Sequence, residues 1–195
     1  MVELVEETVR AGPLTLKILR PPDPGALIDV ERFKEEEFMP YWAELWASGV
    51  KLATVVADRD VRGLSVLELG CGLGVPSITA ALGGATVLAV DWAQEALDVT
   101  RQNAERNGAS LETLRADWSK PETLLERAPF DLVLCSDVLY EPRNVDALLE
   151  LLPQLTGEVL LGEPGRATAG RFFEGAEPSW LIGREGEVSV LRARG

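Results

Sequence analysis

The sequence contains no histidine among its 195 residues. This absence excludes the mechanisms that need an imidazole, such as Ser-His-Asp hydrolysis, cysteine proteolysis with a histidine base, and the common histidine-based zinc sites. Cysteine is nearly as scarce, because Cys71 and Cys135 are the only two and lie far apart in the sequence. Two cysteines cannot build a disulfide scaffold or a zinc ribbon, so we expect no metal centre.

Basic residues are also few in comparison with acidic residues. The chain has 19 lysines and arginines against 32 aspartates and glutamates, which gives a formal net charge of −13. A protein that binds DNA or a large RNA normally presents a basic surface to the phosphates. We therefore expect no nucleic-acid partner, and the charge favours a small molecule or a basic patch on another protein.

Long apolar runs are missing as well. The first ten residues, MVELVEETVR, have neither the cationic nor the apolar region of a signal peptide, and no run reaches the ~18 apolar residues of a membrane span. We therefore expect a cytoplasmic protein with no membrane partner. Only 3 Asn and 3 Gln occur beside 12 Pro, which is typical of a thermophile, although a GC-rich genome produces the same bias.

The residues that are present indicate one folded core, since 46% are hydrophobic and 26% are charged. Residues 1–20 alternate polar and apolar on both sides of Ala11-Gly12, which predicts a β-hairpin. Prolines then interrupt the chain at 21–25, the charged segment 31–38 has a helix-compatible composition, and 41–58 shows helical spacing. We divide the chain into an N-terminal hairpin and linker, residues 1–40, and a main domain, residues 41–195.

The main domain alternates strand and helix patterns. Strands are expected at 65–69, 86–91, 111–117, 130–137 and 158–163, helices at 75–82, 94–107, after 121 and at 145–152, and two final strands on either side of 185–186. This alternation predicts an α/β fold with a mostly parallel sheet covered by helices on both faces. The final two strands add an antiparallel hairpin at one edge, which makes seven strands in all.

A glycine-rich loop follows the first strand of this domain. Gly70, Gly72 and Gly74 lie in LELGCGLGVP, where the backbone can approach a ligand and the next helix directs its amides into the crevice. The dinucleotide fingerprint G-x-G-x-x-G fails, because Val75 takes its last position. Glu68, two residues before the first glycine, is able to face the cationic amino group of a ligand. The alternative is a purely structural turn.

The next two strands also end in acids. Asp91 is placed to accept hydrogen bonds from both hydroxyls of a ribose, and Trp92 to pack on an adenine. Asp117 and Trp118 repeat the acid–aromatic pair after the third strand, where the acid would accept from an adenine amino group. A single aspartate at such a position is commonly a helix cap. Acids at three successive strand ends beside a glycine loop favour a nucleoside site.

Together these motifs resemble those of the class I, seven-strand, Rossmann-like methyltransferases that use S-adenosylmethionine (SAM). The resemblance covers residues 41–195, with VLELGCGLG similar to their first motif. It implies SAM as the cofactor. The implied cofactor-binding residues are Trp46, Glu68, Gly70, Cys71, Gly72, Gly74, Asp91, Trp92, Asp117, Trp118 and Ser136.

Three further segments resemble the protein-lysine methyltransferases of this fold. Residues 42–53 fit the pattern W-x-x-x-W-x-S-G-x-x-L-A, SDVLY at 136–140 fits D-x-x-Y, and LLGEPGR at 160–166 is similar to the methyltransferases of the electron-transfer flavoprotein β subunit. The resemblance implies that Trp46 borders the SAM pocket. It also implies two catalytic residues: Asp137 captures and orients the acceptor amine, and Tyr140 walls the pocket. Loop capping and plain packing are the alternative roles.

The leading interpretation is therefore an enzyme that methylates a lysine of a protein, with the electron-transfer flavoprotein β subunit as one possible partner. A small-molecule N-methyltransferase of the nicotinamide type and a non-catalytic SAM-binding module remain as alternatives. The segment after residues 130–137 lacks the proline pair with which nucleic-acid amino methyltransferases present a flipped base. A closed pocket over Asp137 would favour a small molecule, and an open groove would favour a protein lysine.

Overall fold

The computed structural model describes residues 3–27, 39–118 and 120–195. The charged segment 31–38, with its helix-compatible composition, lies outside the described residues. The expected N-terminal hairpin is confirmed: β1 (Val5–Ala11) pairs antiparallel with β2 (Leu14–Arg20), with Gly12 at φ 57° in the turn. The backbone of β2 is bound by Asn103, which accepts from the Leu19 amide at 2.7 Å, so the hairpin is attached to the main domain.

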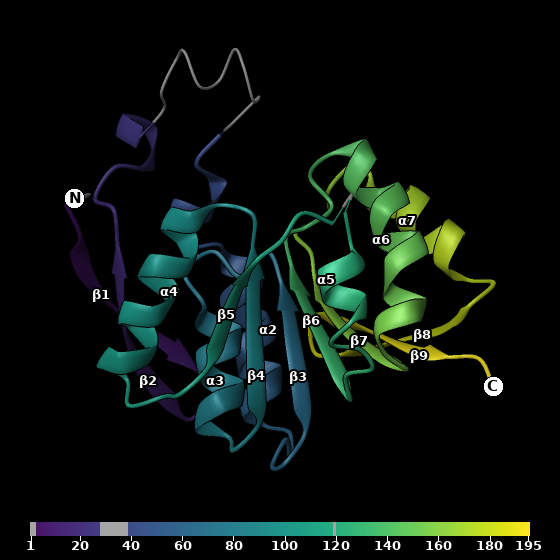
Figure 1. Cartoon of the computed structure of the whole chain (residues 1–195), viewed down its shortest axis with the longest axis horizontal. Helices are drawn as coiled ribbons and strands as arrows, with labels where there is room; N and C mark the ends of the chain where they lie inside the picture. Colours follow the sequence, from purple (N-terminus) through teal and green to yellow (C-terminus); the bar gives the residue numbers. More distant parts are fainter. Residues whose placement is uncertain (1–2, 28–38, 119) are drawn as a thin grey trace.

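The main sheet has seven strands, as the sequence predicts, and the structure shows their order to be β5-β4-β3-β6-β7-β9-β8 (Figure 1). Their bounds are β3 Ser65–Leu69, β4 Thr86–Asp91, β5 Glu112–Arg115, β6 Leu132–Ser136, β7 Glu158–Gly162, β8 Trp180–Glu185 and β9 Val188–Ala193. Strands β3 to β7 pair in parallel, whereas β9 pairs antiparallel with both β7 and β8. The carboxyl ends of five strands therefore meet at one edge of the sheet, where ligands bind in such folds.

Helices cover both faces of this sheet. The α-helices are α2 Ala47–Ala57, α3 Val75–Leu82, α4 Gln94–Arg106, α5 Glu122–Leu125, α6 Pro142–Leu155 and α7 Ala169–Ala176, and the 3-10 turns are η1 Pro24–Leu27 and η2 Tyr41–Ala43. Successive strand residues point to opposite faces, so one set packs against α5, α6 and α7 and the other against α2 and α3. Among the helices in the described ranges, none has the length and apolar character needed to cross a bilayer.

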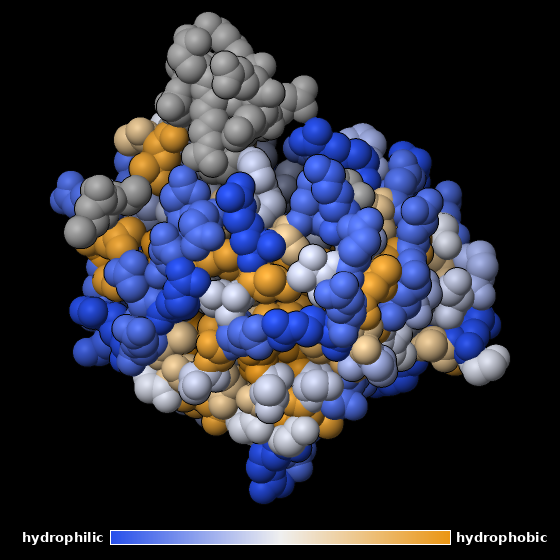
Figure 2. Space-filling model, viewed as in Figure 1, coloured by the Kyte–Doolittle hydropathy of each residue, from blue (hydrophilic) through white to orange (hydrophobic). Residues whose placement is uncertain are grey.

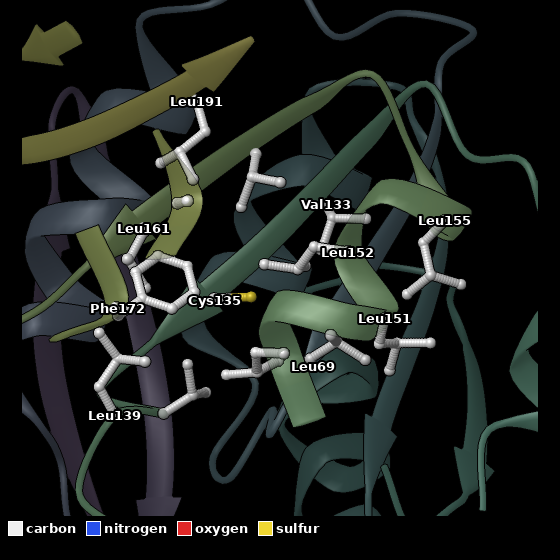
Figure 3. Packing of buried hydrophobic residues seen from close by; sticks show 14 of the residues in the cluster. Leu69, Val133, Cys135, Leu139, Leu151, Leu152, Leu155, Leu161, Phe172 and Leu191 are labelled. Atoms are coloured by element: carbon white, nitrogen blue, oxygen red, sulfur yellow. The ribbon is translucent and has the colours of Figure 1, made fainter. Parts of the chain in front are cut away.

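The largest buried cluster lies on the side of α6 and α7. Figure 3 shows Phe172 of α7 and Leu152 of α6 directed at strand residues such as Cys135 and Leu161. All four side chains are at most 2% exposed. At the surface, Figure 2 shows hydrophilic residues over the flanks of the viewed face, with apolar groups exposed between them.

The helix expected at residues 41–58 begins later in the structure than the sequence predicts. The spacing of residues 41–58 predicts a continuous helix, but the structure has the single turn η2, an extended segment, and α2 only from Ala47. Trp46 has extended backbone angles (φ −70°, ψ 130°), and its indole Nε1 donates to the Tyr41 carbonyl oxygen at 2.9 Å. The aromatic spacing therefore reflects side chains that line a cavity and not a continuous helix face.

Smaller differences concern element lengths. Strand β5 is shorter than the expected 111–117, so Asp117 and Trp118 lie in the loop after it. Helix α6 is longer than the expected 145–152 and begins at Pro142, a residue suited to a first helical turn. Helix α7, which carries Phe172 and Phe173, was not expected from the sequence pattern.

Candidate active site

A cavity of about 770 Å³ opens at the carboxyl edge of the sheet. It falls within the size range of small-ligand and cofactor sites. Its walls come from the segment before α2, from the loops after β3, β4, β5 and β6, and from the loop after β7. Every predicted site residue except Glu68 lines it, namely Trp46, Gly70, Cys71, Gly72, Gly74, Asp91, Trp92, Asp117, Trp118, Ser136, Asp137 and Tyr140.

The loop after β3 requires glycine at specific points. Gly72 and Gly74 have φ values of 52° and 79°, in the left-handed region that favours glycine. A Cβ atom at Gly74 would lie 2.7 Å from Cγ2 of Thr100 on α4, and one at Gly72 would lie 3.2 Å from the Trp42 carbonyl oxygen. The loop is therefore held tightly between α4 and the segment before α2, with its backbone facing the cavity.

Asp91 ends β4 inside the cavity wall. Its Oδ2 accepts from the Gly72 amide at 3.0 Å, and its Oδ1 accepts from the Ala93 amide at 3.0 Å. Burial raises the pKa of this carboxyl to about 6, so it is mainly ionised at pH 7. The Trp92 amide also bonds this carboxylate, which has about four lone-pair sites, so acceptor capacity remains for a ligand hydroxyl.

Glu68 has a different position from the one expected. Its side chain is fully buried and does not line the cavity. Its Oε2 accepts from the Ser77 amide at 2.9 Å and from the Ser77 hydroxyl, while Oε1 has no hydrogen-bond partner. The structure does not place Glu68 where the predicted contact with a ligand amino group would form, because its side chain turns towards the first turn of α3. Burial raises the pKa of this carboxyl to about 8, so it is mainly protonated at pH 7.

The predicted adenine side is assembled after β4 and β5. Trp92 is 39% exposed, and its carbonyl oxygen accepts from Arg115 Nε at 2.8 Å. The Trp118 ring lies against Gly70, since a Cβ there would be 3.3 Å from its Cζ2. Cys71 lines the same side, but burial raises the pKa of its thiol, so the group stays neutral and has a packing role.

The part of the cavity lined by the loops after β6 and β7 contains an ion pair that the sequence did not reveal. Asp137 is 5% exposed, has φ 54°, and its Oδ1 and Oδ2 accept from Nε and Nη2 of Arg166, both at 2.7 Å. The expected carboxylate free to capture an amine is thus already paired with a guanidinium. The two residues lie on the loops after β6 and β7, so only the sheet order, with β6 beside β7, brings them together.

Aromatic side chains flank this pair. The rings of Tyr41 and Tyr140 lie 5.1 Å apart between centroids, and the Arg166 guanidinium lies 5.4 Å from the centroid of the Trp46 ring. Desolvation raises the pKa of Tyr140 to about 12, so its hydroxyl stays protonated. Tyr41 and Arg166 were not predicted as site residues. The tyrosine was hidden in the helical spacing, and the arginine lay within a segment noted only for its resemblance.

These features define a class. A seven-strand sheet of this order, with a glycine loop after β3, a buried acid ending β4 and an acid–aromatic pair after β5, is the architecture of the SAM-dependent methyltransferases. The cavity also fits the cofactor, because Asp91 has lone pairs free for ribose hydroxyls and the loop backbone is uncovered. Within the described ranges, no group of three or more metal-binding side chains occurs.

Comparisons with known proteins narrow the class. A family model described as lysine methyltransferase matches residues 32–168, and the chain belongs to this family. The electron transfer flavoprotein beta subunit lysine methyltransferase of Xenopus laevis is 36% identical over 137 residues, 66% of this chain and 54% of that protein. The histone-arginine methyltransferase METTL23 of Mus musculus is 30% identical over 153 residues, 74% of this chain and 60% of that protein.

The chain thus spans only slightly more than half the length of these curated relatives. Among solved structures, the 16S rRNA N2 G1207 methyltransferase of T. thermophilus in complex with AdoMet and guanosine matches with a TM-score of 0.70. That likeness covers 98% of this chain and 50% of the other at 18% identity, so it bears on the fold alone.

Proposed function

We propose that this chain transfers a methyl group from SAM to a side-chain nitrogen of a protein, and that the nitrogen belongs to lysine. The observation that carries the proposal is one cavity with two distinct sides. Acids and a glycine loop at the ends of β3, β4 and β5 suit a nucleoside, and an aromatic-walled Asp137 at the end of β6 suits an amine. Membership of the lysine methyltransferase family supports the same acceptor.

The cofactor side would hold SAM by its nucleoside. Asp91 would accept from the ribose hydroxyls, Trp92 and Trp118 would contact the adenine, and Asp117 would accept from its amino group. The amides of the glycine loop would face the remaining polar groups. When bound, SAM supplies a methyl group on a positively charged sulfur, which a nitrogen lone pair can attack.

The acceptor side would align that nitrogen. Transfer is an in-line displacement, so the protein mainly contributes position and exclusion of water. Tyr41, Tyr140 and Trp46 form apolar walls that suit the carbon chain of a lysine. Asp137 would accept a hydrogen bond from the amine nitrogen and direct its lone pair at the methyl group. The lysine ammonium would first release a proton to water, because only the neutral amine has a lone pair; the new N–C bond would then form as the S–C bond breaks.

A protein substrate is favoured by the outer part of the cavity. Tyr41 and Tyr140 are 42% and 37% exposed at this rim, so the acceptor side is open to solvent. Glu44 and Glu141 also line the cavity, and the chain has a net charge of −13, which attracts basic segments. The β subunit of electron-transfer flavoprotein is the first substrate to test, because curated relatives at 33–36% identity carry it in their names.

Labelled SAM incubated with the purified β subunit, and in parallel with fractionated host lysate, tests the proposal. Mass spectrometry should locate the label on a lysine side chain of a protein. Label confined to small molecules would instead support the nicotinamide-type alternative. Calorimetric binding of SAM without turnover on any fraction would support a binding module, and binding of NAD without SAM would reject the function altogether.

A further inference from the structure

The Arg166–Asp137 pair lies inside the cavity and not on the outer surface. The Asp137 side chain is 3% exposed and that of Arg166 is 34% exposed. Both guanidinium–carboxylate contacts are 2.7 Å, the parallel two-bond geometry that fixes both partners. The hydrogen bonds to Asp137 raise the pKa of Arg166 further, so its positive charge persists at every working pH.

The loop that carries Arg166 is itself tied down. Glu163 Oε2 accepts from the amides of Gly165 and Arg166 at 2.6 and 3.2 Å, and the Thr168 hydroxyl donates to the Leu139 carbonyl oxygen. The Asp137 amide also donates to the Gly162 carbonyl oxygen at 2.8 Å. The loops after β6 and β7 are thus joined at several points. Arg166 is therefore held in the cavity wall by its own loop, and displacing it would break its bonds to Asp137 and Glu163.

This pairing changes what Asp137 can do to an amine. A lone carboxylate stabilises the ammonium form, which has no lone pair and cannot attack. Because Arg166 cancels that charge, the site has no net attraction for a second cation. Arg166 uses two of the about four lone-pair sites of the carboxylate, so Asp137 can still accept a hydrogen bond from a neutral amine.

We propose that Arg166 is a positioning residue that cancels the charge of Asp137, so that the acceptor nitrogen reaches the site uncharged. The inference rests on the proposed function and assigns a role to the ion pair within it. Among the described residues, the other ionisable groups that line this cavity or act on Arg166 are Tyr41, Glu44, Cys71, Asp91, Arg115, Asp117, Tyr140, Glu141, Arg143 and Glu163. The two other cations among these described groups are engaged elsewhere: Arg143 is bridged to Glu141, and Arg115 donates to the Trp92 carbonyl oxygen, so neither replaces the charge that Arg166 supplies.

The first test is the pH dependence of kcat for methylation of the purified electron-transfer flavoprotein β subunit, with SAM and the β subunit both saturating, because kcat reports the ionisation of the bound amine. Arg166→Gln leaves Asp137 uncompensated, so the pH at which the amine becomes reactive should rise by about one unit, a roughly tenfold loss at pH 7. Arg166→Lys keeps the charge and should shift less. The double variant Arg166→Gln, Asp137→Asn restores neutrality and should return the profile towards wild type, at a lower maximal rate.

Arg171→Gln is the matched control. Arg171 pairs with Asp146 between α7 and α6, outside the residues that line the cavity, and both side chains are more than half exposed. This variant removes one guanidinium five positions along the chain and should leave the profile unchanged. A profile that does not move in Arg166→Gln, or one equally displaced in the double variant, overturns the inference. Thermal unfolding checks that each variant is folded.

The second test needs no turnover. Binding of n-butylamine, a mimic of the lysine side chain, is measured by calorimetry at pH 7 with S-adenosylhomocysteine present. Arg166→Gln should bind the ammonium form about tenfold more tightly than wild type, and the double variant should show no gain. Equal affinities in wild type and Arg166→Gln overturn the inference. If wild type binds SAM but methylates no protein, the proposed function fails, and this measurement still decides the role of Arg166.

Discussion

The two sides of the cavity are built in different ways. The cofactor side consists of short contiguous segments, each of which follows a strand and carries its own recognisable residues, such as the glycine loop and Asp91. The acceptor side is assembled from three segments that are distant in the sequence, represented by Tyr41, Asp137 and Arg166. Under the proposed function, the comparison implies that local chain geometry would recognise the cofactor, whereas contacts between loops would recognise the acceptor.

Of the changes on the two sides of the cavity, Asp91→Ala should have the largest effect, and that effect should be on SAM affinity. The change removes a carboxylate that would bind the ribose hydroxyls, and we expect SAM affinity to fall roughly 1,000-fold, since hydrogen bonds to charged groups contribute about 1.5–3 kcal/mol each. Isothermal titration with SAM measures it. The amides of Gly72 and Ala93 also lose their acceptor, so the melting temperature of the free protein should decrease.

The control for this change is Asp98→Ala. Asp98 lies on the exposed part of α4, where it accepts from Gln94 and Arg101 outside the cavity. SAM affinity should remain within twofold of wild type. An Asp91→Ala variant that binds SAM normally would remove Asp91 from the cofactor site and, with it, the proposed division of the cavity.

Asp137→Asn changes the acceptor side and should lower turnover. Asparagine tolerates the left-handed backbone at this position, so the fold should persist. The substitution leaves the Arg166 guanidinium uncompensated and weakens the alignment of the amine, so we expect turnover to fall roughly 100-fold. SAM affinity should stay within a few-fold, because the acids assigned to SAM follow other strands.

Steady-state kinetics and calorimetry on the same preparation test this separation. Asp146→Asn, which alters the exposed partner of Arg171, is the control and should behave as wild type. Near-normal methylation by Asp137→Asn would reduce Asp137 to a loop cap. A large loss of SAM binding would move it to the cofactor side.

Gly74→Ala tests how rigidly the cofactor side is preformed. The new methyl group would lie 2.7 Å from the Thr100 Cγ2 atom in a residue at φ 79°. Strain at positive φ and overpacking should together lower the free energy of unfolding by about 2 kcal/mol. Gly108→Ala is the matched control, because Gly108 has φ 70° but nothing within 4 Å of the added atom.

Urea unfolding of the two alanine variants therefore separates strain from clash. Gly108→Ala should lose only about 1 kcal/mol, the part that comes from positive φ. Equal losses in both variants would show that the contact with α4 is loose and that the loop is not held in place by it.

Much of the fold could be predicted because its patterns are local. The apolar runs of β3, β6 and β7 are buried on both faces, so they appear in the sequence as short continuous strands separated by helical periods. The prediction of a continuous helix around Trp46 was wrong for the opposite reason. Its aromatic spacing fits a helix, but the tertiary arrangement directs these rings into a cavity, and no local rule reports that.

The same distinction between local patterns and tertiary contacts applies to the residues of the site. Asp91 and the glycine loop could be assigned from their distance to a strand end. Glu68 was assigned to the ligand on the same argument, yet strand alternation and the neighbouring α3 direct it towards Ser77. Arg166 could not be linked to Asp137, since 29 residues separate them and only the adjacency of β6 and β7 brings them together.

Glu68→Gln should change the pH dependence of stability and leave ligand binding intact, which sharpens the account of the cofactor side. Burial raises the pKa of Glu68 to about 8 in the folded protein, against about 4.3 for an exposed glutamate. Between these values the folded protein holds a proton that the unfolded chain has released. Its stability should therefore fall as pH rises, by up to about 1.4 kcal/mol per pH unit from this group.

Glutamine is neutral at every pH and keeps an oxygen for the Ser77 amide. The stability of the variant should therefore lack the decrease with rising pH that comes from Glu68. Urea unfolding between pH 6 and 8 is the measurement, because the similar contribution of Asp91, with its pKa at about 6, is largely complete there. We expect the stability of wild type to fall relative to that of Glu68→Gln as the pH rises from 6 to 8. Glu174→Gln, at an exposed position on α7, is the control. Parallel curves for wild type and Glu68→Gln would mean that Glu68 is ionised under the loop, and the protonated contact with Ser77 would have to be abandoned.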